Sequence, residues 1–417
     1  NADFLVRPKN SKECAIILRV CAKYKIPITI SAGQTNLTGS ATPYGGVVLS
    51  TNNLTYPKMS INIKNKEVLS PTGIPLEVMR KYVLKKSNHK LYYPVDPTSR
   101  NDAYVGGTIA CNASGFIPGE KGATRFWVKE IELVLSNGYS LKIKRGKYFS
   151  NKGVFILICG GKKISLPIPR YKRPQIKNAS GPYSSENNEI DFIDLIIGSE
   201  GIFGMITECK LKLDDKPSDY LNMFLRLNNE KKALNLHKFL FSLSNKKKLA
   251  ISAFEYFGYN CQQYMKHKRF LFNKPNEVGV YIQSPIDNTT SFNTQLNQFA
   301  DLLISFDSKL DLNNIIMLND PQHWKKFFEA RHSIPENALT KTKKIKGISI
   351  ITDTIVPPNN LENYLKNIHL KLQTKKIEYL LFGHLGDCHL HFHLIPTKNQ
   401  EKQCLEIYDF MIDLSSK

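Results

Sequence analysis

The sequence predicts an α+β protein of two domains, and three observations indicate this. A chain of 417 residues is too long for one ordinary hydrophobic core. Its first half reads as short strands with few helices between them. From "DDKPSD" (214–219) onward, longer helical patterns alternate with strands, which is typical of an antiparallel sheet with helices on one face. The expected division is a first domain over 1–215, a second over 216–395 and a C-terminal segment over 396–417.

One helix and one hairpin give the clearest local signals in the first half. Residues 11–24 begin with a serine cap, and an apolar face repeats through Cys14, Ile17, Leu18 and Cys21. The segment "VKEIELVLSNGYSLKIK" (128–144) predicts two strands joined at an Asn-Gly turn. The other elements expected in this half are strands at 26–30, 46–50 and 61–70 and a helix at about 75–87.

The second half carries more helical periodicity than the first. The expected helices lie at 230–244, 293–306, 322–331 and 359–372. The expected strands lie near 221–227, 251–257, 278–283 and 348–356.

Composition restricts the class of protein. Hydrophobic residues make up 41% of the chain, and no apolar run approaches the roughly 18 to 20 residues of a membrane span. The eight cysteines are scattered without a CxxC motif, which favours reduced thiols in an intracellular, cytoplasmic protein. The chain opens on Asn1 rather than Met, so mitochondrial targeting by a segment that precedes Asn1 is a second possibility for its location.

The formal net charge of +22 permits two interpretations. The lysines come in short runs such as "NKKKL" (245–249) and "KTKKIK" (341–346), with no basic helical stripe and no nucleic-acid recognition motif. We therefore expect a compositional excess of lysine over every face, with attraction to an anionic membrane surface as the second interpretation. No nucleic-acid partner is expected.

A glycine-rich loop, "SAGQTNLTGSATPYGGVV" (31–48), lies between two expected strands. Glycine and small polar residues let the backbone approach a ligand and offer N–H groups to an anion, which suits a diphosphate. An ordinary turn is the alternative. The loop is neither a Walker loop nor a dinucleotide fingerprint, because Gly-Lys-Ser/Thr and G-x-G-x-x-G before a helix are absent.

Two further stretches, "YYPVDPTSRNDAYVGGTIACNASG" (92–115) and "DFIDLIIGSEGIFGMITECKLKL" (191–213), follow this loop. The glycine-rich loop and these two stretches, taken in this order, resemble the corresponding segments of the FAD-linked 2-hydroxy-acid dehydrogenases and oxidases. This is the group of D-lactate, glycolate and D-2-hydroxyglutarate enzymes. The resemblance runs over nearly the whole chain. It implies a two-part FAD-binding domain of the p-cresol-methylhydroxylase and vanillyl-alcohol-oxidase type, an α+β cap domain with an antiparallel sheet, and a C-terminal segment that returns toward the FAD-binding domain.

The same resemblance implies which residues contact FAD. The loop that would hold the pyrophosphate comprises Gly33, Gln34, Thr35, Asn36, Leu37, Thr38 and Gly39. The residues that would line the flavin are Asp96, Ser99, Gly106, Gly107, Asn112 and Gly115. The Gly-Ser-Glu-Gly stretch at 198–201 and Ile206 would shape the adenine and ribose end. Because the pyrophosphate loop contains no His or Cys, we expect noncovalent FAD.

The segment "FGHLGDCHLHFHLIP" (382–396) holds four histidines. On a strand, His389, His391 and His393 would alternate onto one face about 7 Å apart. Converging imidazoles suit a divalent metal such as zinc or manganese. The segment resembles the family's His-x-Gly-Asp-Gly-Asn-x-His signature, which implies that His384 and His391 hold the metal. Cys388 and His389 stand where that signature has Gly and Asn.

Residues for the substrate and for proton transfer come from two places. Arg331, in "FFEARHSIPENAL" (327–339), reads as a surface arginine by itself, but the resemblance implies that it binds the substrate carboxylate. Ile351 stands where the hydroxyglutarate enzymes use a lysine, which argues against a second carboxylate on the substrate. Relatives end with a Glu-His-Gly motif that supplies a metal ligand and a base, and the given sequence stops at Lys417 without it. Either the given chain lacks that end, or the protein has lost this base and the metal site with it. The candidate substitutes for the base are His389 and His393.

These expectations combine into one function, with alternatives. The chain is expected to oxidise a small 2-hydroxy acid of the D-lactate or glycolate type to the 2-oxo acid by hydride transfer to FAD. The electron acceptor would be a quinone or an electron-transfer protein. The alternatives are a flavin-binding protein of the same fold without this activity, and an FAD enzyme resembling the ether-lipid synthases.

Overall fold

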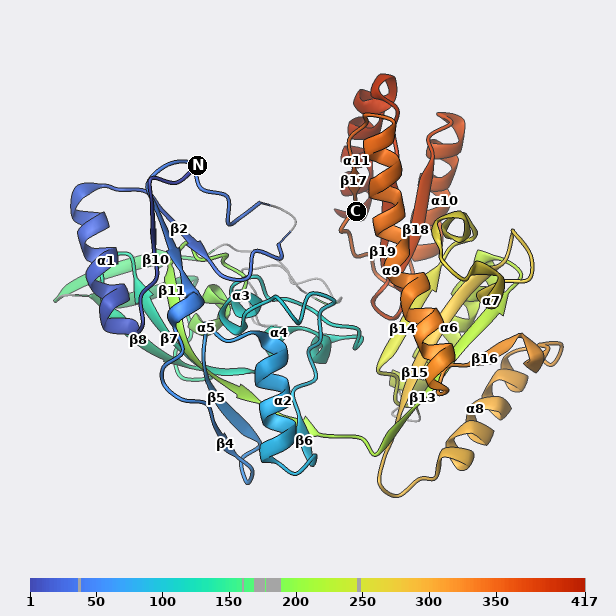
Figure 1. The fold of residues 1–417 in the computed structure, drawn as a ribbon, viewed down its shortest axis with the longest axis horizontal. Coiled ribbons are helices and arrows are strands. Elements are labelled where there is room, and N and C mark those ends of the chain that lie inside the picture. Colours follow the sequence, from blue (N-terminus) through green and yellow to red (C-terminus); the bar gives the residue numbers. More distant parts are fainter. Residues whose placement is uncertain (37–38, 160, 169–176, 178–188, 246–248, 417) are drawn as a thin grey trace. The chain divides into compact units, whose positions relative to one another are not determined.

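The computed structural model describes residues 1–36, 39–159, 161–168, 177, 189–245 and 249–416 (Figure 1). The chain divides into two compact units. Unit 1 comprises Asn1–Gly115 and Glu120–Lys216, and unit 2 comprises Phe116–Gly119 and Pro217–Lys417. The sequence-based boundaries and the return of 396–417 toward the FAD-binding half stay predictions.

Unit 1 opens with a small parallel sheet beside one helix. The sheet has the order β1-β3-β2, made of β1 (Phe4–Val6), β3 (Val47–Ser50) and β2 (Ile28–Ser31). Helix α1 (Ser11–Tyr24) begins where the Asn10 side chain accepts the backbone N–H of Glu13 at 3.0 Å, so its cap is Asn10 and not the predicted serine. Its predicted apolar face is confirmed, because Cys14, Leu18 and Cys21 are buried.

A five-stranded antiparallel sheet forms the centre of unit 1. Its order is β4-β5-β11-β7-β8, with bounds β4 (Ser60–Asn62), β5 (Glu67–Pro71), β11 (Gly204–Lys212), β7 (Val128–Leu135) and β8 (Ser140–Lys144). The predicted hairpin is confirmed, and Gly138 has the positive φ of +81° that its turn requires. The helices of this unit are α2 (Leu76–Lys86), α3 (Val105–Ala110), α4 (Thr124–Trp127) and α5 (Phe192–Ile196). Two short strand pairs complete it: β6 (Leu91–Tyr92) with β12 (Asp214–Asp215), and β9 (Val154–Cys159) with β10 (Lys162–Pro167).

Unit 2 is built on a seven-stranded antiparallel sheet. The strand order is β16-β13-β15-β14-β18-β19-β17. The bounds are β13 (Asp219–Leu227), β14 (Ala253–Phe257), β15 (Val278–Ile286), β16 (Ile315–Met317), β17 (Ile350–Ile351), β18 (Tyr379–His384) and β19 (His389–Leu394). The last strand expected by sequence, over 348–356, is shorter than predicted. Beyond Ile351, the Thr352 side chain accepts the N–H of Phe392 at 3.0 Å, a position that a backbone carbonyl would occupy in a continued ladder.

Helices cover both faces of this sheet, whereas the sequence predicted one face. Four helices pack on the first face, namely α6 (Glu230–Asn245), α8 (Phe292–Phe306), α10 (Leu361–Thr374) and α11 (Glu401–Ser416), and α10 and α11 lie side by side (Figure 1). On the second face, Phe327 of α9 (Pro321–Lys344) contacts Phe224 and Tyr281 of the sheet, and the one-turn helix α7 (Lys268–Leu271) adds to the same core. Helix α9 continues past Pro335, beyond its expected end at 331, because Ile334 and Ala338 are buried in that core.

The second face of the sheet also carries the histidines. Residues directly opposite each other in an antiparallel pair point to the same face. Glu255 is opposite His384, and His384 is opposite His389. The sheet register therefore gathers these side chains on one surface. No helix in the described part of the chain is long and apolar enough to span a membrane.

Candidate active site

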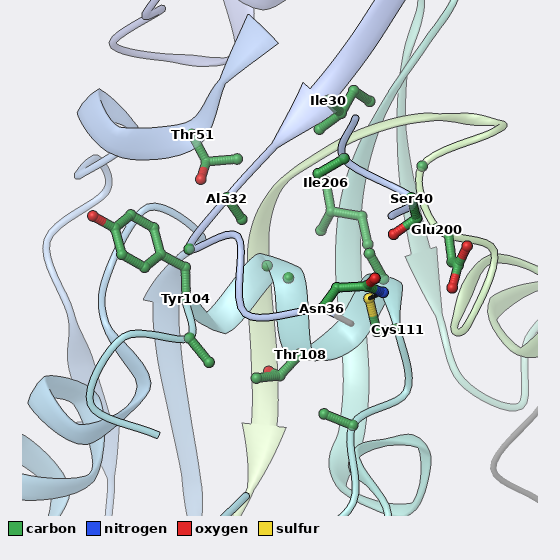
Figure 2. Close-up of a pocket in the computed structure, with 18 of the residues that line it drawn as sticks. Ile30, Ala32, Asn36, Ser40, Thr51, Tyr104, Thr108, Cys111, Glu200 and Ile206 are labelled. Carbon is green, nitrogen blue, oxygen red and sulfur yellow. Dashed lines mark hydrogen bonds between the residues drawn. The ribbon is translucent and has the colours of Figure 1, made fainter. Parts of the chain in front are cut away.

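Unit 1 contains a pocket between the glycine-rich loop, α3 and β11 (Figure 2). The loop follows β2 directly, and the pocket wall also includes the turn at 199–201. Eleven of the residues expected to contact FAD line it: Gly33, Gln34, Thr35, Asn36, Ser99, Gly106, Gly107, Ser199, Glu200, Gly201 and Ile206.

The loop holds its backbone close to its neighbours. A β-carbon on Gly33 would lie 2.0 Å from the carbonyl oxygen of Asp102, so only glycine fits there. Asn36 Oδ1 accepts the backbone N–H of Gly39 at 3.0 Å, and Gln34 Nε2 donates to Ser31 Oγ at 3.1 Å. Both side chains therefore have hydrogen-bond partners within the loop and at the end of β2.

The pocket also presents an unpaired hydroxyl. Thr51 lies directly after β3, is 3% exposed and lines the pocket (Figure 2). Its Oγ1 has no hydrogen-bond partner among the described residues. Buried hydroxyls almost always have a partner, so a polar group of a ligand is the expected one. With the close-packed glycines, this hydroxyl makes the pocket fit a nucleotide cofactor such as FAD.

Other residues expected to contact FAD lie outside this lining. Asp96 accepts a hydrogen bond from Arg100 Nη1 at 3.2 Å, and a β-carbon on Gly115 would lie 2.6 Å from the Asp96 nitrogen. Asn112 is buried and accepts the N–H of Arg125 at 2.8 Å. Gly39 donates its backbone N–H to Asn36 Oδ1. Leu37 and Thr38 fall outside the described residues. The roles of all these residues stay predictions.

The pocket includes residues that sequence reasoning missed. Thr51, Tyr104 and Cys111 line it, and none was expected to do so. A signal exists for Thr51, because a polar Thr-Asn-Asn run follows the apolar strand directly. Tyr104 and Cys111 flank the Gly106-Gly107 helix, so their position follows from that helix.

In unit 2, three of the four predicted histidines form a cluster. His384 ends β18, while His389 and His391 lie on β19. The ring centroids are 5.7 Å apart for His384 and His389, 5.6 Å for His384 and His391, and 4.5 Å for His389 and His391. Between the strands, Cys388 has a φ of +54°, a left-handed conformation that glycine adopts more readily than other residues.

Each of the three rings is fixed through one nitrogen. His384 Nδ1 lies 2.5 Å from Glu255 Oε1, His391 Nδ1 lies 3.1 Å from the Thr352 carbonyl oxygen, and His389 Nε2 lies 2.5 Å from Asp353 Oδ1. Carbonyls and carboxylates accept hydrogen bonds, so these ring nitrogens carry the protons. The unprotonated nitrogen is then Nε2 in His384 and His391 and Nδ1 in His389.

The pKa shifts of two residues in this cluster favour the protonation states that bind a cation. Burial, and then the neighbouring imidazoles of His389 and His384, lower the pKa of His391 to about 3. The hydrogen bond from His389 lowers the pKa of Asp353 below its usual value. A neutral imidazole and an ionised carboxylate are the forms that bind divalent metals.

The side-chain positions give one possible ligand set, which differs from the set predicted from sequence. Ligand atoms of Asp353, His389 and His391 lie within 4.8 Å of one another. The sequence instead predicted His384 and His391 as the ligands. In each of these residues Nδ1 is used in a hydrogen bond, so Nε2 is the nitrogen that could bind a metal. The residues present therefore fit a divalent metal, and both sets include His391.

Arg331 and His384 of this cluster contact the same carboxylate, that of Glu255. Its Nη2 donates to Glu255 Oε2 at 2.7 Å, and its guanidinium lies over the Phe116 ring at 4.5 Å. The side chain is 14% exposed, so it is not the freely solvated surface arginine of the first interpretation. Its Nη1 has no hydrogen-bond partner among the described residues, and it remains for an anionic ligand.

His393, the other candidate base, is fully buried. Its Nε2 lies 3.0 Å from Ser349 Oγ, and burial lowers the pKa of His393 to about 4. The structure therefore groups His384, His389 and His391, while His393 lies in the interior beside β17.

Glu255 and Asp353 are residues of this site that sequence reasoning missed, and Glu255 has the more central position. Glu255 is buried and binds both His384 and Arg331. Burial raises the pKa of the Glu255 carboxyl, but His384 and Arg331 outweigh that effect and hold it well below its usual range. The available signal was a single acid inside the apolar run "SAFEYF" (252–257).

Two family models identify this chain as an FAD-linked oxidoreductase. The FAD binding domain family matches residues 2–144, and the C-terminal domain family of the FAD linked oxidases matches residues 273–417. The chain belongs to the FAD-linked oxidases. The resemblance inferred from sequence is thereby confirmed.

Curated relatives of this chain have the following names. A D-lactate dehydrogenase of Archaeoglobus fulgidus is 23% identical over 99% of this chain and 79% of that protein. A D-lactate dehydrogenase of Anaerostipes hadrus is 24% identical over 96% of this chain and 74% of that protein. The glycolate oxidase subunit GlcD of Bacillus subtilis is 24% identical over 93% of this chain and 72% of that protein.

Solved structures show the same fold. An alkyldihydroxyacetonephosphate synthase matches with a TM-score of 0.69 at 15% identity, over 99% of this chain and 70% of that one. p-Cresol methylhydroxylase matches with a TM-score of 0.67 at 14% identity, over 98% of this chain and 78% of that one. The predicted fold class, an α+β fold with an FAD-binding domain of the p-cresol-methylhydroxylase type, is confirmed.

Proposed function

We propose that this protein oxidises a small 2-hydroxy acid of the D-lactate or glycolate type to the corresponding 2-oxo acid. The observation that carries the proposal is the arrangement of Arg331 and the three-histidine cluster around one buried carboxylate, Glu255. A guanidinium for a carboxylate and imidazoles for a hydroxyl match the two functional groups of such an acid. The curated D-lactate and glycolate relatives support the same substrate class.

The residues of unit 1 would hold FAD noncovalently. The loop of Gly33 to Asn36 would approach the pyrophosphate, and the Thr51 hydroxyl would donate a hydrogen bond to the cofactor. When bound, FAD supplies the two-electron acceptor that takes the α-hydrogen of the acid as hydride.

Each residue of unit 2 would have one task. Arg331 would bind the substrate carboxylate through Nη1. His389 would take the hydroxyl proton on Nδ1, while Asp353 accepts the hydrogen bond from Nε2 and stabilises the resulting imidazolium. Zinc or manganese held by His384 and His391 would lower the pKa of the substrate hydroxyl. His393 stays the second candidate base, and its complete burial argues against it.

The side chain of the acid would be small and uncharged. Ile351 is opposite His393 in the sheet, and in the alternating pattern of β19 His393 shares a face with His389 and His391. Ile351 is also 40% exposed, so an apolar residue is available beside the histidines. This supports D-lactate or glycolate over a substrate with a second carboxylate.

The electron acceptor is inferred to be a quinone or an electron-transfer protein. The net charge of +22 is compatible with an anionic membrane surface as the place of transfer. A peripheral membrane contact and an intracellular location remain predictions from composition.

An anaerobic absorbance experiment tests the proposed function. The FAD-loaded protein would be mixed with D-lactate, L-lactate, glycolate or D-2-hydroxyglutarate, each with and without zinc or manganese. Bleaching of the flavin band by D-lactate or glycolate is the expected result. A stable flavin band with every acid would instead support a flavin-binding protein without this activity.

A further inference from the structure

We infer that Glu255 is a positioning residue that holds His384 and Arg331 in one fixed arrangement, so that metal binding and carboxylate binding depend on the same side chain. This inference rests on the proposed function, because it assigns roles to His384 and Arg331.

The geometry gives each carboxylate oxygen a separate partner. Oε1 of Glu255 lies 2.5 Å from His384 Nδ1. Oε2 lies 2.7 Å from Nη2 and 3.3 Å from Nε of Arg331. Strand β14 carries the glutamate, β18 carries the histidine and α9 carries the arginine, so one side chain joins three elements.

For His384, the contact sets both the tautomer and the direction of the ring. The carboxylate accepts the proton of Nδ1 and leaves the lone pair on Nε2. A carboxylate behind a histidine ligand also makes the imidazole a stronger donor toward a metal. The rings of Phe116 and His384 form an edge-to-face pair with centroids 6.0 Å apart, and this contact further limits rotation of the imidazole.

For Arg331, the contact occupies one edge of the guanidinium. Nε and Nη2 face Glu255, while the ring of Phe116 lies against the guanidinium face at 4.5 Å. The Nη1 group is then the part that a substrate carboxylate can reach. Because the planar group cannot rotate without breaking these contacts, its free edge keeps one direction.

The burial of Glu255 makes this arrangement sensitive to substitution. Its side chain is only 2% exposed, and an ionised carboxylate so deep in the protein requires hydrogen-bonded partners. The ion pair with Arg331 uses only Oε2 in this structure. The use of Oε1 for a histidine that faces other histidines is what indicates a role beyond stability.

The test compares Glu255→Gln and Glu255→Asp in the full FAD-loaded chain with the matched control Glu277→Gln. Glu277 is also a buried glutamate of unit 2, but it accepts backbone N–H groups of Asn273 and Lys274. The measurements are Co²⁺ affinity and its visible bands, KM and kcat for D-lactate, and the melting temperature.

We expect Glu255→Gln to lower Co²⁺ affinity about 10- to 100-fold, alter the visible bands and raise KM. Glu255→Asp should recover part of the affinity because it restores the charge, and Glu277→Gln should change only the melting temperature. Unchanged Co²⁺ bands and KM in Glu255→Gln, or a wild-type protein that binds no Co²⁺, would overturn the inference. If wild-type protein binds Co²⁺ but no acid bleaches the flavin, the proposed function fails, while the Co²⁺ comparison still decides whether Glu255 positions His384.

Discussion

His391 Nδ1 donates a hydrogen bond to the carbonyl oxygen of Thr352 at 3.1 Å, across 39 residues of sequence. A carbonyl can only accept, so this contact assigns the proton to Nδ1 and leaves Nε2 of His391 unprotonated. His384 has the same tautomer for a different reason, its contact with Glu255. Two histidines with matching free nitrogens on neighbouring strands are what a metal site requires.

This relationship predicts how single histidine substitutions affect metal binding. His384→Ala and His391→Ala should each lower Co²⁺ affinity by about 100-fold or more, because each removes a ligand. His389→Ala should keep the affinity within a few-fold but slow flavin reduction by about 10²- to 10⁴-fold, because it removes the base. Isothermal titration with Co²⁺ and stopped-flow absorbance measure the two effects. The reverse result, in which His389→Ala abolishes binding and His384→Ala does not, would establish Asp353, His389 and His391 as the ligands.

Arg331→Lys tests carboxylate binding while keeping the charge beside Glu255. A lysine cannot reproduce the planar fork, so we expect kcat/KM for D-lactate to fall about 100-fold, mainly through KM. Steady-state kinetics with an artificial acceptor measure this change. The matched control is Arg226→Lys, because Arg226 donates to the backbone carbonyls of Leu271 and Phe270 instead. Equal losses in both variants would mean that Arg331 acts only in folding.

Thr51→Val tests the unpaired hydroxyl of the unit 1 pocket. The substitution keeps the shape of the side chain and removes one hydrogen bond to the cofactor, worth about 1 to 2 kcal/mol, or about 5- to 30-fold in FAD affinity. Titration of apo-protein by flavin fluorescence measures it. Thr207→Val is the control, because Thr207 Oγ1 is also buried without a partner among the described residues but does not line the pocket. Wild-type FAD affinity in Thr51→Val would exclude that contact.

Ile351→Lys tests the preference for a substrate with one carboxylate. A cation at this exposed position of β17 should pair with a second carboxylate and raise kcat/KM for D-2-hydroxyglutarate about tenfold, while that for D-lactate falls. The ratio of the two efficiencies is the measurement, and Ile351→Met controls for the loss of the branched side chain. A ratio that stays the same in Ile351→Lys would mean that this residue does not face the substrate.

Several elements were predictable because short-range patterns encode them. The apolar face of α1, the Asn-Gly turn between β7 and β8, and the loop around Gly33 depend on residues that are close in sequence. The alternation of histidines along β19 was visible in the same way. The length of α9 was not, because buried contacts of Ile334 and Ala338 outweigh the presence of Pro335.

The sequence by itself determined the class of protein, and it predicted the glycine-rich loop of the pocket and the segments that contain Arg331 and the histidine cluster. Only the tertiary structure decided that Glu255 joins Arg331 to His384, that Thr51 faces the pocket, and that His393 is buried while His389 is not. These contacts depend on strand register and on packing between elements as much as 129 residues apart. A local pattern specifies which way a side chain alternates along its own strand, but the partner it meets is set by the neighbouring strand and by the helix that covers the sheet.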